Sequence, residues 1–145
     1  MTTYPDPNSQ LQELSAEECW ALVRSQSIGR FAANRRWQSP LVVPVNYVVD
    51  ADHSIVFRSG EGAKLDAVTQ GLVAIQVDEV DPLHRTGWSV VVEGNAEWLH
   101  VQDDLTSVDT WAPGDRPFVV RVHPTGLTGR RITLGLPDTD GRGYR

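Results

Sequence analysis

Residues 41–49, with the sequence LVVPVNYVV, constrain the fold more than any other part of the chain. The segment is rich in β-branched residues and, apart from Asn46, apolar on both faces, which is a strong signal for a β-strand. Pro44 cannot donate a hydrogen bond to a neighbouring strand, so it predicts a sheet edge, a bulge or backbone that faces a ligand. Residues 50–53 predict a hairpin turn, and residues 54–58 predict the antiparallel partner strand.

The remaining periodicities predict a mainly β chain. Further strands are expected over residues 28–33, 72–78, 87–99, 117–123 and 125–134, and Gly94 predicts a bulge inside the long strand 87–99. Ser15 and Glu18 form a capping-box pattern that begins a helix. Other short helices are expected over residues 64–71 and 100–111. Because strands and helices do not alternate regularly, we expect a six-stranded antiparallel barrel with accessory helices.

The expected domain organisation is simple. A length of 145 residues is that of one domain. We expect a flexible arm over residues 1–12, one barrel domain over residues 13–136 and a flexible tail over residues 137–145.

A glycine-containing loop follows the strand 54–58. Gly60 and Gly62 let the backbone approach a ligand, and the first amides of a helix beginning near Lys64 attract anions. Arg58 and Lys64 add two positive charges, and the Ser59 hydroxyl adds a donor. These residues predict a phosphate-binding loop, with a plain strand-to-helix turn as the alternative.

Composition excludes several classes of protein. The formal net charge of −6 argues against a general binder of nucleic acid or anionic membranes. Cys19 is the single cysteine, so no internal disulfide forms, and it is expected to be a small buried apolar group. No apolar run reaches transmembrane length and the N-terminus lacks a signal peptide pattern, so a cytoplasmic location is expected.

The titratable residues predict no metal site and identify no catalytic side chain. The four histidines share no metal-binding spacing, and each is expected on the surface or in a loop: His53, His84, His100 and His123. The acidic run within residues 78–81 is expected to be solvated, with a hard-cation site as the alternative.

Five segments taken in order resemble one protein family. They are GRFAAN (29–34), PLVVPVNYVVD (40–50), SIVFRSGEGAKLD (54–66), GWSVVVEGNAEW (87–98) and GRRI (129–132). Together they are similar to the pyridoxamine 5′-phosphate oxidase-like proteins over residues 14–132. This resemblance implies a split β-barrel, FMN as cofactor, and a homodimer with flavin at the subunit interface.

The resemblance also implies which residues bind the flavin. The loop after residue 57 matches the family's phosphate-binding segment, residues 45–46 match the strand whose backbone lies along the isoalloxazine ring, and residues 88–89 begin a strand with a flavin-contacting side chain. The expected cofactor-binding residues are Val45, Asn46, Arg58, Ser59, Lys64, Trp88 and Ser89. Arg130 and Arg131 match a late basic motif to which no role is assigned.

Three functions follow as hypotheses. The first is an FMN-dependent oxidoreductase acting on a small molecule, in which the flavin performs the chemistry. The second is a non-catalytic carrier or sensor of haem or of the deazaflavin F420. Haem requires a nearby histidine, and the deazaflavin requires a basic groove, for which the candidates are Arg35, Arg36, Arg116, Arg130 and Arg131. The third is a structural dimer whose site is empty.

Overall fold

The computed structural model describes residues 9–60, 71–100, 116 and 118–134. This part of the chain contains seven strands and one α-helix. In chain order they are β1 (Ser9–Glu13), α1 (Ala16–Arg24), β2 (Ile28–Ala33), β3 (Leu41–Val49), β4 (Ile55–Ser59), β5 (Leu72–Asp81), β6 (Thr86–His100) and β7 (Phe118–Leu134).

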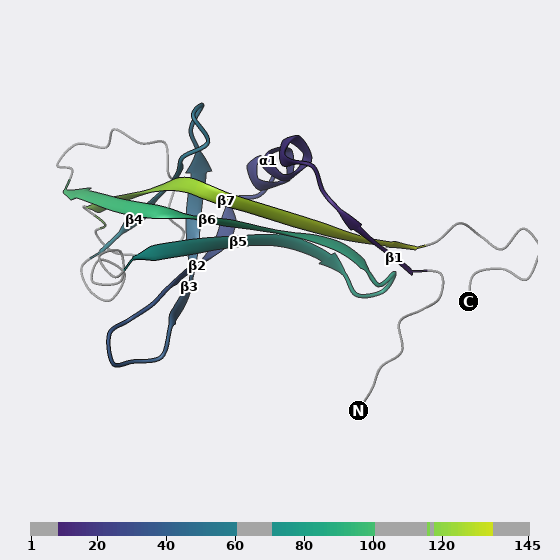
Figure 1. Cartoon of the computed structure of the whole chain (residues 1–145), viewed down its shortest axis with the longest axis horizontal. Helices are drawn as coiled ribbons and strands as arrows, with labels where there is room; N and C mark the ends of the chain where they lie inside the picture. The colour runs from purple at the N-terminus through teal and green to yellow at the C-terminus, as the bar shows by residue number, and fades with distance from the viewer. Residues whose placement is uncertain (1–8, 61–70, 101–115, 117, 135–145) are drawn as a thin grey trace, which may run out of the picture.

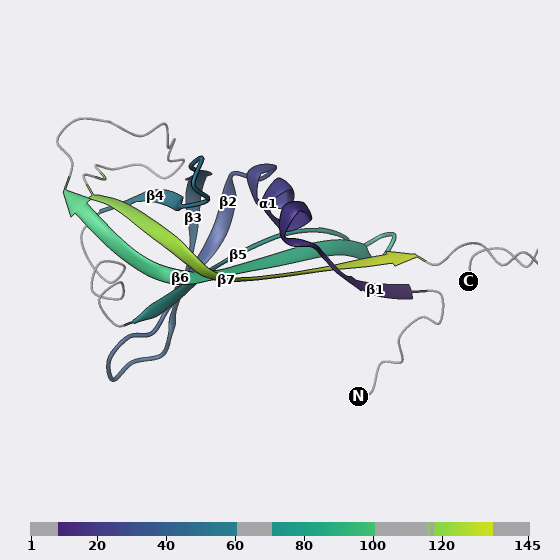
Figure 2. The same ribbon diagram turned by 45° about the horizontal axis from the view of Figure 1, so that its top comes forward.

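The strands form one antiparallel sheet that closes on itself. Six of them follow the order β7-β4-β3-β2-β5-β6, and the pairing of β6 with β7 closes the ring. Strand β1 pairs with the far end of β7, outside the ring. Figure 1 shows β5, β6 and β7 continuing beyond the barrel towards β1, and Figure 2 shows α1 on one side of this extension. The predicted mainly β fold, a six-stranded antiparallel barrel, is confirmed.

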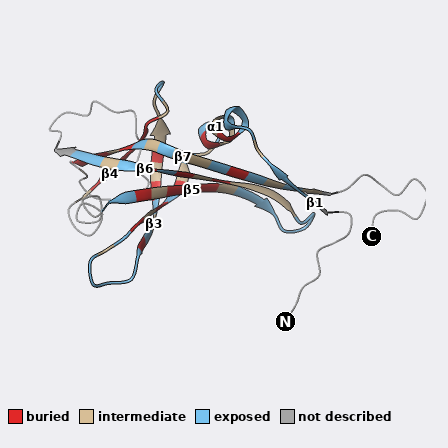
Figure 3. Ribbon diagram, viewed as in Figure 1, coloured by how far each residue is buried: buried red, intermediate tan, exposed pale blue. Residues whose placement is uncertain are grey.

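Each strand presents alternate side chains to two faces of the sheet. The inner face encloses the core, and on β5 it carries the buried residues Val73, Ile75 and Val77. The opposite face, called the outer face below, carries Leu72 and Val80, which are exposed. Figure 3 shows the buried residues gathered on the barrel strands and on α1. The register between strands therefore decides which side chains share a face.

Helix α1 begins where the sequence predicts. The Ser15 hydroxyl accepts a hydrogen bond from the Glu18 backbone N–H at 3.2 Å, and the Glu18 carboxylate accepts one from the Ser15 N–H at 3.4 Å. This confirms the predicted capping box. Cys19 and Val23 face the core at 1% and 0% exposure, so Cys19 is the buried apolar group that was expected. Burial, and secondarily the charge of Glu18, raises the pKa of the Cys19 thiol.

Several boundaries differ from the prediction. Residues 9–12, predicted as a loose arm, belong to β1, where Gln10 pairs with Thr133 and Leu11 with Ile132. Strand β5 continues to Asp81, and β7 is one continuous strand where two were expected. The physical reason is long-range pairing: β6 lies beside β5 and β7 along its length and extends both. The predicted helices 64–71 and 100–111 lie almost wholly outside the described residues.

Two sequence irregularities have structural explanations. The register of β6 and β7 shifts between Glu93 and Gly94, which confirms the predicted bulge, and a Cβ at Gly94 would lie 2.2 Å from the His123 carbonyl oxygen. Pro44 pairs with Arg30 on β2, whereas β4 opposes only residues 47–49. Among the described residues, Pro44 therefore lies at a sheet edge on its β4 side, one of the three predicted alternatives.

Packing of α1 on β7 depends on the absence of a side chain at Gly129. A Cβ there would lie 2.4 Å from Cys19 Sγ and 3.3 Å from Leu14. We expect Gly129→Ala to lower the free energy of unfolding by about 1–3 kcal/mol in urea denaturation, because the helix must shift. Gly126→Ala on the same strand is the control, since its Cβ would meet nothing closer than 3.4 Å. Equal losses for the two variants would show that this contact does not matter.

Candidate functional site

One lateral row of residues crosses the outer face of the barrel. Ile28 pairs with Asn46, Asp78 with Ser89, and Ser89 with Arg130. Continuing the registers of β2 with β5 and of β3 with β4 sets Ile28 opposite Asp78 and Asn46 opposite Arg58. The complete row, called the outer row below, is Arg58, Asn46, Ile28, Asp78, Ser89 and Arg130.

The predicted cofactor-binding residues divide between the two faces. The side chains of Asn46, Arg58 and Ser89 belong to the outer row. Those of Val45 and Ser59 face inward and are 5% and 3% exposed. Strand alternation causes this division, so a ligand on the outer face meets only the backbone at Val45 and Ser59.

The other two predicted residues are Trp88 and Lys64. Trp88 faces inward, is half-buried and packs against the core cluster, although it also lines two surface cavities. Lys64 lies outside the described residues. Arg58 and Ser89 are four strand spacings apart, about 19 Å along the sheet at about 4.8 Å per strand. The two ends of the outer row therefore contact different parts of any ligand.

At the β4 end of the outer row, the Arg58 side chain contacts the backbone of Arg116. Arg58 Nε donates a hydrogen bond to the Arg116 carbonyl oxygen at 3.0 Å. Arg116 Nε is buried and has no hydrogen-bond partner among the described residues. The Ser59 hydroxyl faces inward and donates to the Gly60 carbonyl oxygen at 2.8 Å. This end of the row thus has the Arg58 guanidinium beside the Arg116 backbone, while the Ser59 side chain is engaged with the Gly60 backbone.

Sequence reasoning listed Arg116 only as a candidate for the deazaflavin groove and not among the residues of the FMN phosphate site. Its position directly before strand 117–123 was visible, but nothing in the sequence indicated that this strand pairs with β4. The register of β4 and β7 places Ser59 opposite Phe118 and Arg58 opposite Val119, which brings Arg116 to the end of β4.

Apolar side chains surround this cationic end. Val56 and Val119 are 1% and 7% exposed and form a small cluster with Val48 on the outer face. Arg58 follows Val56 on this face and is the cross-strand partner of Val119. Because low-polarity neighbours reduce screening, a guanidinium here attracts an anion more strongly than one in open water.

At the β6 end of the outer row, Asp78 is held by two neighbours. The Gln76 side-chain amide donates to one carboxylate oxygen at 3.1 Å, and Arg30 donates to the other at 2.7 Å. The hydrogen bond from Gln76 and then the interaction with Arg30 hold the pKa of the Asp78 carboxyl below its ordinary value. A cavity of about 630 Å³ lies beside Asp78, Ser89 and Arg130.

Three of the histidines are engaged away from the outer row. His53 stacks on Trp20 with ring centroids 4.3 Å apart. The ring of His84 lies 2.6 Å from Asp81, and the ring of His123 lies 3.0 Å from Glu97. Within the described ranges, no group of three or more His, Cys, Asp or Glu side chains is arranged to hold a metal ion.

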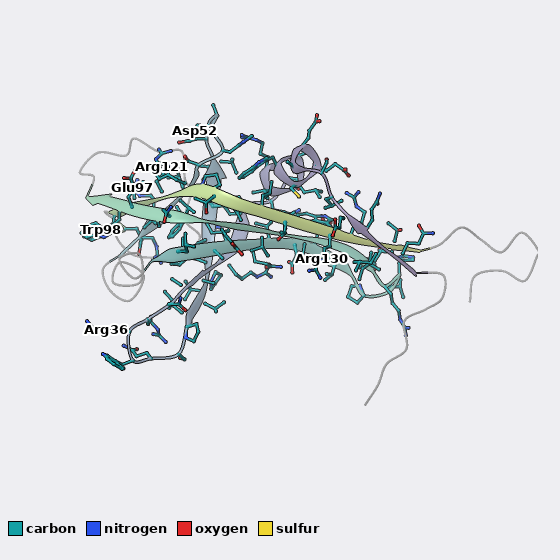
Figure 4. The ribbon with its side chains drawn as sticks, viewed as in Figure 1. Arg36, Asp52, Glu97, Trp98, Arg121 and Arg130 are labelled. Carbon is teal, nitrogen blue, oxygen red and sulfur yellow. The ribbon has the colours of Figure 1, made fainter. Side chains whose placement is uncertain are left out.

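The five candidate arginines of a deazaflavin groove are not all brought together. Arg36 lies on the β2–β3 hairpin and Arg130 on the β5–β6–β7 extension, far apart in Figure 4. Arg131 faces inward to Glu18 of α1 at 3.4 Å, and Arg35 donates to the Ser39 carbonyl of its own hairpin. No helix in the described part of the chain is long and apolar enough to cross a membrane.

The closed six-stranded antiparallel barrel defines a split-barrel protein. The pyridoxamine 5′-phosphate oxidase family model matches residues 15–131, so the chain belongs to this family. An uncharacterised protein of Mycobacterium tuberculosis, Rv0080, is 30% identical over 138 residues, covering 88% of this chain and 90% of its own length.

Solved structures share the fold. A Corynebacterium glutamicum protein named for the same oxidase is 32% identical, with a TM-score of 0.71, covering 86% of this chain and all of its own (100%). An FAD-binding protein from Mycobacterium smegmatis is 33% identical, with a TM-score of 0.62, covering 84% of this chain and 98% of its own.

The lowered pKa of Asp78 makes stability depend on pH. A carboxyl whose pKa is depressed on folding stabilises the protein above its unfolded pKa, and this stabilisation disappears as the pH falls through the folded value. We expect Asp78→Asn to lower the free energy of unfolding by about 0.5–1 kcal/mol at pH 7, because both groups of the ion pair are partly exposed. At about pH 3 and below the difference should shrink, as the wild-type carboxylate becomes protonated.

Urea denaturation at the two pH values measures this difference. The control is Glu93→Gln, which changes an exposed carboxylate that forms no ion pair within the described residues. A difference for Asp78→Asn that is equally large at both pH values would contradict the assigned role of Asp78.

Proposed function

We propose that this protein is an FMN-dependent oxidoreductase whose flavin lies along the outer row, with its phosphate at Arg58 and its ring near Asn46. The observation that carries the proposal is the placement of Asn46, Arg58 and Ser89 on one face of the barrel. Membership of the oxidase family and the resemblance to an FAD-binding protein support a flavin.

The β4 end of the outer row is suited to binding the terminal phosphate group of FMN. A phosphate monoester carries up to two negative charges. Arg58 supplies one positive charge, and Arg116, whose backbone Arg58 contacts, is the candidate for the second. An arginine guanidinium binds phosphate through two parallel N–H groups, which fixes orientation as well as charge. The buried Arg116 Nε, with no partner among the described residues, is a donor that such an anion would satisfy. Lys64, six residues after Arg58 in the sequence, is the third cation that we propose for this phosphate.

Near Asn46, we propose that the flavin ring contacts mainly the backbone edge of β3. Strand β4 opposes β3 only from residue 47 onward, so the preceding edge of β3 has no described strand on that side. The planar ring needs such an accessible edge for hydrogen bonds to its polar rim. When bound, the flavin supplies the hydride or electron transfer. The side chains position it and exclude water, which agrees with the absence of a predicted general acid or base.

The proposal includes a homodimer. Of the eight large hydrophobic side chains that are exposed in the described residues, five face outward from the sheet, in two groups: Val42 and Leu72 on the barrel, and Leu11, Val80 and Ile132 around the cavity beside the β5–β6 hairpin. Beside Val42 and Leu72, Ala32 and Ala74 are cross-strand partners that leave the face flat. An exposed apolar surface such as this barrel group is typical of an interface. A second copy packed on this surface would cover the flavin. The cytoplasmic location stays a prediction.

The first test concerns the cofactor. We expect the purified protein to be yellow and to release FMN, identified by chromatography against FMN and FAD standards. Arg58→Ala combined with Lys64→Ala should weaken FMN binding by at least about 100-fold, because each lost charge-assisted hydrogen bond is worth about 1.5–3 kcal/mol. Arg36→Ala on the exposed β2–β3 hairpin is the matched control. Unchanged FMN affinity in the double variant would disprove the phosphate site.

The second test concerns the dimer. We expect the wild type to sediment as a dimer and Val42→Asp to sediment as a monomer, because Val42 is 63% exposed on the outer face and a buried, unpaired carboxylate is costly. Ala21→Asp, on the exposed side of α1, should leave the dimer intact. Analytical ultracentrifugation decides between these outcomes, and a monomeric wild type would exclude this interface.

A further inference from the structure

The cavity of about 630 Å³ at the β6 end of the outer row has a composition of its own. It lies between the β5–β6 hairpin and the end of β7, beside β1. Its volume is in the range of small-molecule sites in proteins. Figure 4 places Arg130 on this extension, away from Arg121 and Glu97 at the other end of the long strands. Among the residues that line it are Leu11, Val80, Arg85, Ser89, Arg130 and Ile132.

The walls of the cavity are largely apolar. Leu11, Val80 and Ile132 are 65%, 66% and 44% exposed and belong to adjoining strands on the outer face. Trp88 also lines the cavity. Exposed apolar surface that is gathered in a concave site favours a ligand with an apolar body, because binding removes both surfaces from water.

The two carboxylates in the cavity are already bound by neighbouring groups. Asp78 accepts hydrogen bonds from Gln76 and Arg30. Asp81 lies 2.6 Å from the His84 ring and accepts from the backbone N–H groups of Leu83 and His84. These interactions, led by His84, hold the pKa of the Asp81 carboxyl below its ordinary value.

The two guanidinium groups in the cavity differ in this respect. Among the residues that the structure describes, neither Arg85 nor Arg130 forms an ion pair. Arg130 also has none with Glu13, its cross-strand neighbour on β1. In the described residues, the two carboxylates of the cavity therefore interact with neighbouring groups, whereas its two guanidinium groups form no ion pair and can bind an anion.

We propose that this cavity binds an apolar molecule with one anionic group, such as a medium-chain or aromatic carboxylate. Arg130 and Arg85 bind the anionic group, and Leu11, Val80 and Ile132 contact the apolar body. Ser89, at the edge of the cavity, belongs to the same outer row as the proposed flavin site. That such a ligand is the substrate rests on the proposed function, whereas its binding does not.

The test compares three probes of equal length on the purified full-length protein by isothermal titration calorimetry. Decanoate carries the anion, decan-1-ol is neutral and decylamine is cationic. We expect decanoate to bind at least about tenfold more tightly than decan-1-ol, because a charge-assisted hydrogen bond adds that much, and decylamine to bind no better than decan-1-ol. Decanol binding as tightly as decanoate would overturn the proposal.

The variants locate the anion site. Arg85→Gln combined with Arg130→Gln should abolish the preference for decanoate and leave decan-1-ol binding within about twofold, since the apolar wall is intact. Arg36→Gln, an exposed arginine on the β2–β3 hairpin, should bind as the wild type does. The proposed site would be refuted if the double variant kept the decanoate affinity of the wild type. It would also be refuted if no probe bound because a second copy fills the cavity.

Flavin absorbance, measured on the same samples, separates this inference from the proposed function. A colourless protein that still binds decanoate preferentially would support the proposed anion site and contradict the proposed flavin site. A yellow protein without this preference would support the flavin site and contradict the anion site.

Discussion

The pairing of β6 with β7 is the interaction on which the rest of the structure depends. The two strands pair from Gly87 with Ile132 to His100 with Phe118, which closes the barrel at one end and forms the extension at the other. Strand β4 adds to the first half of β7 and β1 to the second half. A shift of one residue in this ladder would exchange every inward and outward side chain, so the register carries both the core and the site.

The bulge at Gly94 shows how strictly that register is set. Gly94 packs against the His123 backbone so closely that no Cβ fits, and the ladder shifts at this point. A bulge adds local twist and bend, which a sheet needs in order to close. Closure in turn sets the outer row across adjoining strands. The candidate site is thus a consequence of barrel geometry, because no one loop contains it.

The sequence predicted those structural features that depend on residues close together in the chain. The capping box at Ser15, the strands 28–33 and 41–49 and the break at Gly94 follow from propensities and steric limits within a few residues. It did not predict β1, the unbroken β7 or the position of Arg116, since these follow from pairing between residues distant in sequence. The resemblance supplied Val45, Asn46 and Arg58 as flavin-binding residues, but only the register assigned their side chains to faces.

Arg130 and Arg131 show why register rather than motif decides a residue's role. They are adjacent in a basic motif to which the sequence assigned no function. Arg131 faces inward and contacts Glu18 of α1 at 3.4 Å, so it helps to hold the helix on the sheet. Arg130 faces outward, in the outer row beside Ser89, where its charge has no described partner. Arg131 therefore stabilises the fold, whereas Arg130 lies on the surface beside the cavity. Their different positions follow from the alternation of side chains along a strand.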